Sequence, residues 1–285
     1  MNAFQKLVRR TRFHGTRLLQ SSKPLDPSRT RGPIVVAALG GSGTRAIVEL
    51  LVESGVYMGR FLDRDTHDSL YIRRFLNAHF DALVGDPEHP DPAIVRAFHR
   101  LIRAHRSGIP HEGDEWGWKN PRSMWLLPFF AQRHPGLRFV HLLRDGRDMA
   151  LSQNHFLLED HGRTILGDRM TGNAVDDQLE LWARGNVRAL EASERFLGSR
   201  ALRIRYEDLC ADPTTELDRL LDFLKRPLSR ATVARIAGTV RPSPGLGRGR
   251  LDRSETLLAA SARHAEALHR FGYATDVATS SAAPT

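Results

Sequence analysis

Short apolar runs alternate with amphipathic segments along the chain, and this alternation is the main structural signal in the sequence. The runs 34–39, 137–143 and 201–206 are too short for core helices and are bounded by glycine or charged residues, which favours buried strands. The segment 115–130 pairs a fourth, shorter strand with a helix that begins near Ser123.

Apolar residues at helical spacing predict helices between these strands. Asp91-Pro92 and Asp212-Pro213 are each typical of a helix start, with an N-cap carboxylate followed by proline in the first turn. The segment 55–70 loses the helical period. One predicted helix begins near residue 44, one covers 70–83, one begins at 92 and one follows 144. Three more are predicted: one over 176–197, one that begins at 213 and a single last helix that ends near 270.

Strands that alternate with helices predict an α/β fold with a mainly parallel sheet flanked by helices on both faces. In such sheets ligands bind at the carboxyl ends of the strands. A chain of 285 residues is long enough for one large domain of this kind. We predict a basic extension at 1–31, the α/β domain at 32–274 and a disordered tail at 275–285.

The positive charge is concentrated at the N-terminus. Residues 1–31 contain eight Lys or Arg and one acid, Asp26, so they carry +7 of the formal net charge of +9 and leave +2 for the remainder. A nearly neutral domain does not favour a general nucleic-acid surface, and we predict no nucleic-acid partner. The extension is predicted to be a solvated tail, with weak membrane-surface contact as the alternative.

Other features of the sequence predict a cytoplasmic protein. Cys210 is the only cysteine, so no intrachain disulfide forms, which fits a reducing compartment. No window is long and apolar enough to span a membrane. Arg9-Arg10 are not followed by the apolar region of an export signal.

The glycine-rich turn after the first strand is a candidate anion site. Glycines allow backbone N–H groups to close on a phosphate, and the dipole of the following helix favours negative charge. The alternative is a tight strand–helix turn that binds nothing. The candidate residues are Gly40, Gly41, Ser42, Gly43, Thr44 and Arg45.

A second candidate site follows the strand 137–143. Arg144 stands at the end of this strand, and Ser152 lies eight residues later, on the predicted following helix. An arginine at a strand end offers a planar fork to a phosphate, and a serine hydroxyl two turns along can donate to the same group. Arg147 and Asp148 are equally typical of a salt-bridged strand–helix corner.

Four pieces of the chain, LGGSGTR, GWKNP, LLRDGRDMALS and RYEDL, together resemble the PAPS-dependent sulfotransferases, of the bacterial type. The resemblance covers residues 33 to about 251 and implies the P-loop-like sulfotransferase fold. It implies that the first turn holds the 5′-phosphosulfate of 3′-phosphoadenosine 5′-phosphosulfate (PAPS). It further implies that Arg144 and Ser152 hold the 3′-phosphate, that Tyr206 lies near the adenine, and that Arg248 and Arg250 complete the 3′-phosphate site.

The first turn departs from the family pattern at Gly41, where most members have Lys or Arg. The run GTR instead resembles the turn of heparan sulfate 3-O-sulfotransferases, which implies a catalytic role for Arg45. Lys119 matches a catalytic lysine of tyrosylprotein and polysaccharide sulfotransferases. The alternative for Lys119 is an ordinary surface lysine.

An acid about two dozen residues beyond the turn serves as the base in related enzymes, which implies this role for Asp63. Asp65 and His67 are alternatives, and a loop without a catalytic acid is another. The histidine that some family members place two residues after the lysine is Pro121 here. We predict no metal site, because cations suffice for the leaving group and no cluster has ligand-like spacing.

The function that the resemblance implies is in-line transfer of a sulfuryl group from PAPS to an acceptor hydroxyl on a carbohydrate, glycolipid or small molecule. One alternative is a degenerate member that binds nucleotide without turnover, which Gly41 motivates. Another is a P-loop nucleotide kinase, although the motif GxxxxGK[ST] is absent.

Overall fold

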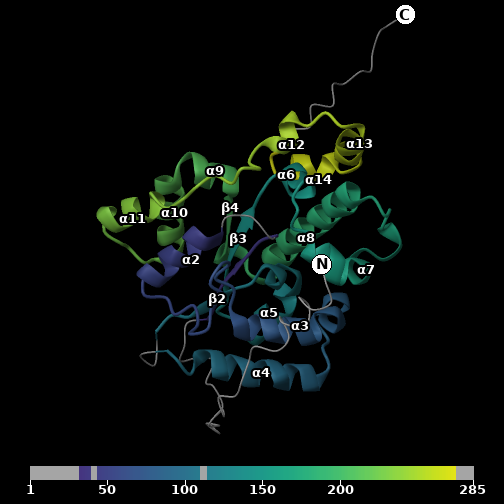
Figure 1. The fold of residues 1–285 in the computed structure, drawn as a ribbon. Coiled ribbons are helices and arrows are strands. Elements are labelled where there is room, and N and C mark those ends of the chain that lie inside the picture. Colours follow the sequence, from purple (N-terminus) through teal and green to yellow (C-terminus); the bar gives the residue numbers. More distant parts are fainter. Residues whose placement is uncertain (1–31, 40–43, 110–113, 274–285) are drawn as a thin grey trace, which may run out of the picture.

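One parallel sheet organises the protein (Figure 1). The computed structural model describes residues 32–39, 44–109 and 114–273, and within these residues four strands pair in the order β2-β1-β3-β4. All three pairings are parallel, so the predicted mainly parallel sheet is confirmed. The strands are β1 (Ile34–Ala37), β2 (Gly117–Lys119), β3 (Arg138–Leu143) and β4 (Ala201–Arg205).

The register brings the candidate residues to one edge of the sheet. Val36 of the central strand β1 lies opposite Lys119 of β2 and Val140 of β3. Leu143, the last residue of β3, lies opposite Arg205, the last residue of β4. Because the carboxyl ends of parallel strands share an edge, the residues that follow β1, β2, β3 and β4 come together there.

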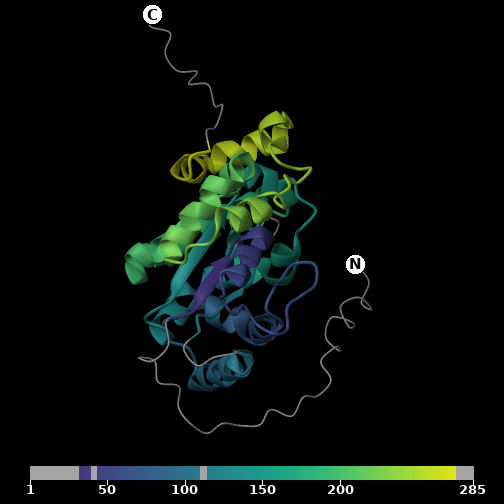
Figure 2. The ribbon, with the colours of Figure 1, turned by 90° about the vertical axis from the view of Figure 1, so that its left-hand side faces the viewer.

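Alternate side chains of β1 enter two separate apolar clusters, as expected from the period of two in a strand. Val35 and Ala37 belong to the larger cluster, whereas Ile34 and Val36 belong to the smaller one. Figures 1 and 2 show the helices of the smaller cluster together on one side of the strands. That cluster is built with α2 (Thr44–Glu53), α10 (Pro213–Leu224) and α11 (Arg230–Ala237). The larger cluster is built with α3 (Leu70–Gly85), α4 (Pro92–Arg106), α5 (Leu127–Arg133) and α8 (Ala174–Phe196).

Short elements complete the edge and the connections. They are η1 (Pro121–Leu126), α6 (Gly146–Ala150), α7 (Phe156–Leu166), η2 (Gly167–Arg169), η3 (Gly198–Arg200), α9 (Tyr206–Ala211), α12 (Arg248–Leu251), α13 (Glu255–Arg263) and α14 (Ala265–Arg270). None of the described helices has the length and apolar content needed to cross a membrane. The predicted extension 1–31 and all residues C-terminal to 273 lie outside the described residues, so those boundaries stay predictions.

The two helix starts predicted from aspartate-proline pairs are confirmed, whereas the helix predicted to begin near Ser123 is the 3-10 helix η1 followed by α5 from Leu127. The carboxylate of Asp91 accepts a hydrogen bond from the backbone N–H of Ala93, and that of Asp212 from the N–H of Thr215. The prediction of a single last helix ending near 270 was wrong, because the chain bends at His264 and forms two helices, α13 and α14. The bend brings Phe271 and the ring of Tyr273 onto Trp182 of α8, with centroids 5.7 and 6.1 Å away.

Two histidines are buried in the core in their neutral form. His105 Nε2 donates to the carbonyl of Gly117, and His141 Nε2 donates to Asn186 Oδ1, each over 2.9 Å. Burial lowers the pKa of each imidazole to about 4. The unfolded chain therefore binds more protons than the folded chain between about pH 4 and pH 6.5.

We expect the free energy of unfolding to be largest above about pH 6.5 and to fall as the pH drops toward 4, by on the order of 2 kcal/mol for each buried histidine. Urea unfolding at a series of pH values measures this. Gln at position 141 keeps a donor for Asn186 and does not titrate, so His141→Gln should show a shallower dependence. An equally steep dependence in that variant would contradict the assignment.

Candidate functional site

The glycine turn lies largely outside the described residues, which exclude Gly40, Gly41, Ser42 and Gly43. Thr44 begins α2 and is buried, and Arg45 is exposed at its second position. No acidic residue occupies the first turn of α2, so this helix N-terminus carries no carboxylate that would repel an anion. The role of the turn and of Arg45 stays a prediction.

Lys119 ends β2 and is buried, with 5% of its surface exposed. Its Nζ donates to Asp68 Oδ1 over 2.5 Å and to the carbonyl of Thr66 over 2.9 Å. The carbonyl of Lys119 accepts from the N–H of Ser69 over 2.9 Å. The loop 63–69 is thus wrapped around the ammonium group, and the alternative of an ordinary surface lysine is wrong.

Asp63 contributes to the shape of this loop. Its Oδ1 accepts from the N–H groups of Asp65 and Thr66, and its Oδ2 from Arg73 Nη1 over 2.9 Å. Burial alone raises the pKa of the Asp63 carboxyl, but the hydrogen bonds from Thr66 and Arg73 outweigh it and lower the pKa to about 2. A carboxyl with so low a pKa is a weak base, and Asp63 as the catalytic base stays a prediction.

Asp68 is the carboxylate that lies in contact with Lys119, and sequence reasoning did not select it. Asp65 is exposed, and His67 is half-buried with a φ of 56°, in the left-handed region. Only membership of the acidic segment 63–68 could have pointed to Asp68, because its partner is 51 residues away. The contact depends on tertiary structure.

Arg144 is buried at the carboxyl end of β3, with 6% of its surface exposed. Its guanidinium lies over the ring of Tyr206, 5.0 Å from the centroid, and its Nη2 donates to Asp148 Oδ2 over 3.2 Å. Its carbonyl accepts from Trp182 Nε1 over 2.8 Å, which fixes the strand end to α8. Two residues that were predicted separately, Arg144 for the 3′-phosphate and Tyr206 for the adenine, thus lie together, with Tyr206 as the first residue of α9.

Ser152 is not on a helix, contrary to the prediction. α6 spans only Gly146–Ala150, and Leu151 is its C-cap. Ser152 Oγ accepts from the N–H of Asn154 over 3.1 Å in the turn that follows. Its part in binding a phosphate stays a prediction.

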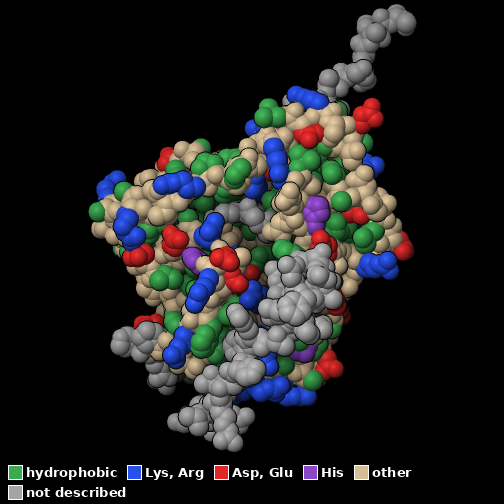
Figure 3. Space-filling view, in the orientation of Figure 1, with side chains coloured by type: hydrophobic (Ala, Val, Ile, Leu, Met, Phe, Trp, Pro, Cys, Tyr) green, Lys and Arg blue, Asp and Glu red, His purple; other side chains and the backbone are tan. Residues whose placement is uncertain are grey.

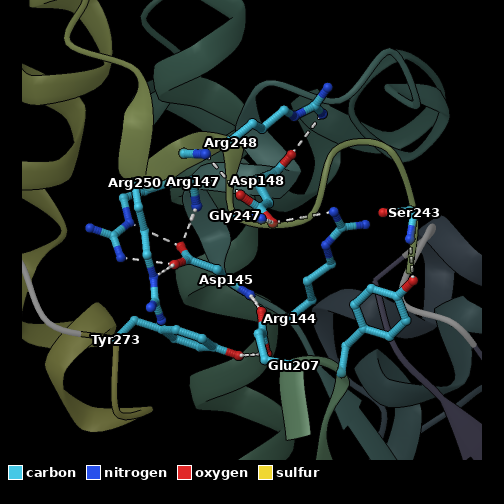
Figure 4. A network of polar contacts seen from close by, with 12 residues as sticks. Arg144, Asp145, Arg147, Asp148, Glu207, Ser243, Gly247, Arg248, Arg250 and Tyr273 are labelled. Carbon is cyan, nitrogen blue, oxygen red and sulfur yellow. Dashed lines mark hydrogen bonds and ion pairs between the residues drawn. The ribbon is translucent and has the colours of Figure 1, made fainter. Parts of the chain in front are cut away.

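The corner between β3 and α6 contains a salt bridge, as the alternative for Arg147 proposed. Asp145 accepts from Arg147 Nε and Nη2 over 3.0 and 2.8 Å. The N–H of Asp145 donates to Glu207 Oε1, whose other oxygen accepts from the hydroxyl of Tyr273. Figure 4 shows how this chain of contacts ties the ends of β3 and β4 to the end of the described chain.

The basic segment 243–250 lies against α6, beside Arg144 (Figure 4). Arg248 Nη2 donates to the carbonyl of Asp148 over 2.8 Å, and Arg250 Nε lies 3.6 Å from Asp145 Oδ2. Gly247 has a φ of 79°, which favours glycine. A Cβ at Gly249 would lie 2.3 Å from the Cβ of Arg147, so only glycine fits there. The role of both arginines toward a nucleotide stays a prediction.

Charge on this face of the molecule is mixed, as Figure 3 shows: Lys and Arg side chains are interspersed with Asp and Glu. The face drawn in Figure 3 therefore carries no broad basic surface where side chains are coloured by type. Within 32–39, 44–109 and 114–273, no group of three or more His, Cys, Asp or Glu residues is placed to hold a metal ion.

Comparison with known proteins finds sulfotransferases. A sequence model of the sulfotransferase family matches residues 33–230. A mouse sulfotransferase solved with PAP has a TM-score of 0.50 at 14% identity, over 84% of this chain and 85% of that chain. A Mycobacterium tuberculosis sulfotransferase has a TM-score of 0.50 at 17% identity, over 83% of this chain and 77% of that chain. At these identities the two structures bear on the fold alone.

Two curated relatives match parts of the chain. Cytosolic sulfotransferase 15 of Arabidopsis thaliana is 27% identical in an alignment of 173 residues that covers 54% of this chain and 46% of the relative. Carbohydrate sulfotransferase 5 of Mus musculus is 34% identical in an alignment of 108 residues that covers 34% of this chain and 27% of the relative. The chain therefore spans less than half the length of the curated relatives it matches.

We expect Gly249→Ala to displace the segment 243–250 from α6, because the added Cβ would overlap Arg147. Overpacking of this kind destabilises by about 1–3 kcal/mol. Urea unfolding and limited proteolysis within the segment measure the effect. Gly85→Ala is the matched control, since a Cβ at Gly85 meets nothing within 4 Å. Equal stability of the two variants would contradict the close approach.

Proposed function

Because the chain belongs to the sulfotransferase family, we propose that it transfers a sulfuryl group from PAPS to an acceptor hydroxyl by in-line displacement. The acceptor class is a carbohydrate, a glycolipid or a small molecule. We further propose that the protein is cytoplasmic, uses no metal and binds no nucleic acid, and that its basic N-terminal segment makes weak contact with a membrane surface.

One observation supports the proposal: two buried cations lie on opposite sides of β1, with Lys119 as the last residue of β2 and Arg144 directly after β3. In the sequence, β1 leads into the glycine turn. A buried cation requires anionic partners, and we propose that an anionic ligand bound at the carboxyl end of β1 is a partner of both cations.

The ligand that we assign to this site is a nucleotide with phosphates at two ends. Arg144, with its guanidinium over the ring of Tyr206, would hold the 3′-phosphate together with Arg248, Arg250 and Ser152. Thr44, Arg45 and the four glycine-turn residues 40–43 would hold the 5′-phosphosulfate. When bound, PAPS supplies the sulfuryl group and a phosphate leaving group. Lys119 and Arg45 stabilise the charge that develops on the leaving oxygen.

We propose Asp68 as the base that takes the proton of the acceptor hydroxyl, in place of Asp63. A base is most effective when its pKa is close to the working pH, and the pKa of Asp63 is about 2. The carboxylate of Asp68 contacts Lys119 Nζ over 2.5 Å, whereas that of Asp63 accepts from the N–H groups of Asp65 and Thr66 and from Arg73. The ammonium group that we assign to the leaving oxygen therefore also orients Asp68.

Thermal unfolding with and without 3′-phosphoadenosine 5′-phosphate (PAP) tests the cofactor. We expect PAP to raise the melting temperature by mass action, and Arg144→Ala to weaken PAP binding by about tenfold to a hundredfold, because a charge-assisted contact to a phosphate is lost. Each variant is compared with its own ligand-free form. Arg195→Ala is the matched control, because Arg195 pairs with Glu88 on the surface.

No stabilisation of the wild type by PAP would rule out the proposed cofactor. Stabilisation by ATP with magnesium, but not by PAP, would favour a nucleotide kinase. Release of PAP from ³⁵S-labelled PAPS in the presence of acceptors, with label found in the acceptor, would rule out a binding protein without turnover.

We expect Asp68→Asn to lower kcat by about a hundredfold or more, the usual contribution of a positioned base, and Asp63→Asn to lower it only a few-fold. The measurement is label transfer to a panel of carbohydrates, glycolipids and phenols. PAP affinity in both variants serves as the control for folding. A larger loss in Asp63→Asn would return the role of base to Asp63.

A further inference from the structure

Asp148 is a fully buried carboxylate between α6 and the segment 243–250, as Figure 4 shows. Its Oδ1 accepts from the N–H of Gly249 over 2.8 Å. Its Oδ2 accepts from the N–H of Gly247 over 2.7 Å and from Arg144 Nη2 over 3.2 Å. One carboxylate thus contacts the candidate phosphate-binding arginine and two backbone amides about a hundred residues away.

The other end of the same segment is held by Tyr206. Its hydroxyl accepts from the N–H of Ser243 over 2.9 Å and donates to the carbonyl of Arg241 over 3.3 Å. Burial raises the pKa of this hydroxyl, which keeps it able to donate. The Arg144 guanidinium therefore lies between the two fixed ends of the segment, over the ring of Tyr206 on one side and against Asp148 on the other.

We propose that Asp148 is a positioning residue for nucleotide binding: it sets Arg144 and the segment that contains Arg248 and Arg250 in the arrangement that receives the 3′-phosphate, and it does not touch the nucleotide. The proposal rests on the proposed function, since it assigns the ligand of this site to a nucleotide 3′-phosphate. Its physical basis is that a buried carboxylate needs donors, and here the donors belong to the two parts that must be aligned.

The direction in which Asp148→Asn changes the affinity for the 3′-phosphate distinguishes positioning from simple electrostatics. A carboxylate beside a phosphate site repels the phosphate, so replacing it with a neutral amide would strengthen binding if charge alone mattered. Positioning gives the opposite result, because Asn accepts through one oxygen only. One of the two amides, or Arg144, then loses its partner and the arrangement is no longer fixed.

The test compares two ligands that differ only in the 3′-phosphate. Calorimetric titration gives the dissociation constants of PAP and of adenosine 5′-monophosphate for the wild type and for Asp148→Asn. We expect the preference of the wild type for PAP to fall by about tenfold or more in the variant, with the affinity for the monophosphate changed by less than about threefold. A purely structural role would weaken both ligands alike.

Asp177→Asn is the matched control. Asp177 is also buried and also accepts three hydrogen bonds, from Thr171 N over 2.7 Å, Thr171 Oγ1 over 2.9 Å and Gly172 N over 3.1 Å, in a different loop. We expect this variant to lose stability while its preference for PAP stays that of the wild type. An equal loss of preference in both variants would overturn the proposal.

Hydrogen exchange on the wild type gives a readout that needs no variant. We expect the amides of Gly247 and Gly249 to be protected before any nucleotide is added, because Asp148 already holds them. Rapid exchange of these amides in the free protein would overturn the proposal even if Asp148→Asn fails to fold.

The outcomes for the two proposals are distinguishable. A wild type that binds PAP better than the monophosphate, with that preference intact or increased in Asp148→Asn, overturns the role of Asp148 and leaves the proposed function standing. A wild type that binds neither nucleotide overturns both.

Discussion

The parallel pairing of β1 with β2 on one side and β3 on the other is the constraint on which the site depends. β2 has only three residues, and its register with β1 sets the position of Lys119 opposite Val36. Val36 also lies opposite Val140 of β3, so Lys119 and Val140 are about 10 Å apart across the sheet, and Leu143 lies three residues further along β3. A change of parallel register would alter the spacing of the two cations along the strand direction.

Buried charge at this edge is compensated by specific carboxylates. Lys119 contacts Asp68, Arg144 contacts Asp148, and Arg147 contacts Asp145. An unpaired buried charge is strongly unfavourable, so these carboxylates allow the cations to be buried before any ligand is bound. Each contact also holds its cation in one position and so offsets the loss of conformational entropy that fixing a long side chain costs.

The sequence predicted the sheet, its direction and most helix starts because those features follow from local patterns. Apolar runs identified β1, β3 and β4, and aspartate-proline pairs identified the starts of α4 and α10. The prediction failed where the outcome depends on distant contacts. The chain bends at His264 so that Phe271 and Tyr273 pack on Trp182, and no local signal reports that packing.

The same distinction applies to the site. Arg144 and Tyr206 were selected from positions at strand ends, and the structure brings them together. Asp68 and Asp148 were not selected, because their partners lie 51 residues away for Asp68 and about a hundred residues away for the Gly247 and Gly249 amides that Asp148 holds. In the sequence, Arg147 and Asp148 together indicated a salt-bridged corner, whereas in the structure Arg147 pairs with Asp145 and Asp148 pairs with Arg144.

The contact between Lys119 and Asp68 also addresses the missing cation at Gly41. In the ligand-free protein the carboxylate offsets the charge of the ammonium group, so the pair is nearly neutral. If Asp68 accepts the proton of the acceptor hydroxyl, its charge is lost and that of Lys119 is no longer offset. The full positive charge then becomes available while negative charge develops on the leaving oxygen, and a single buried pair links proton removal to stabilisation of the leaving group.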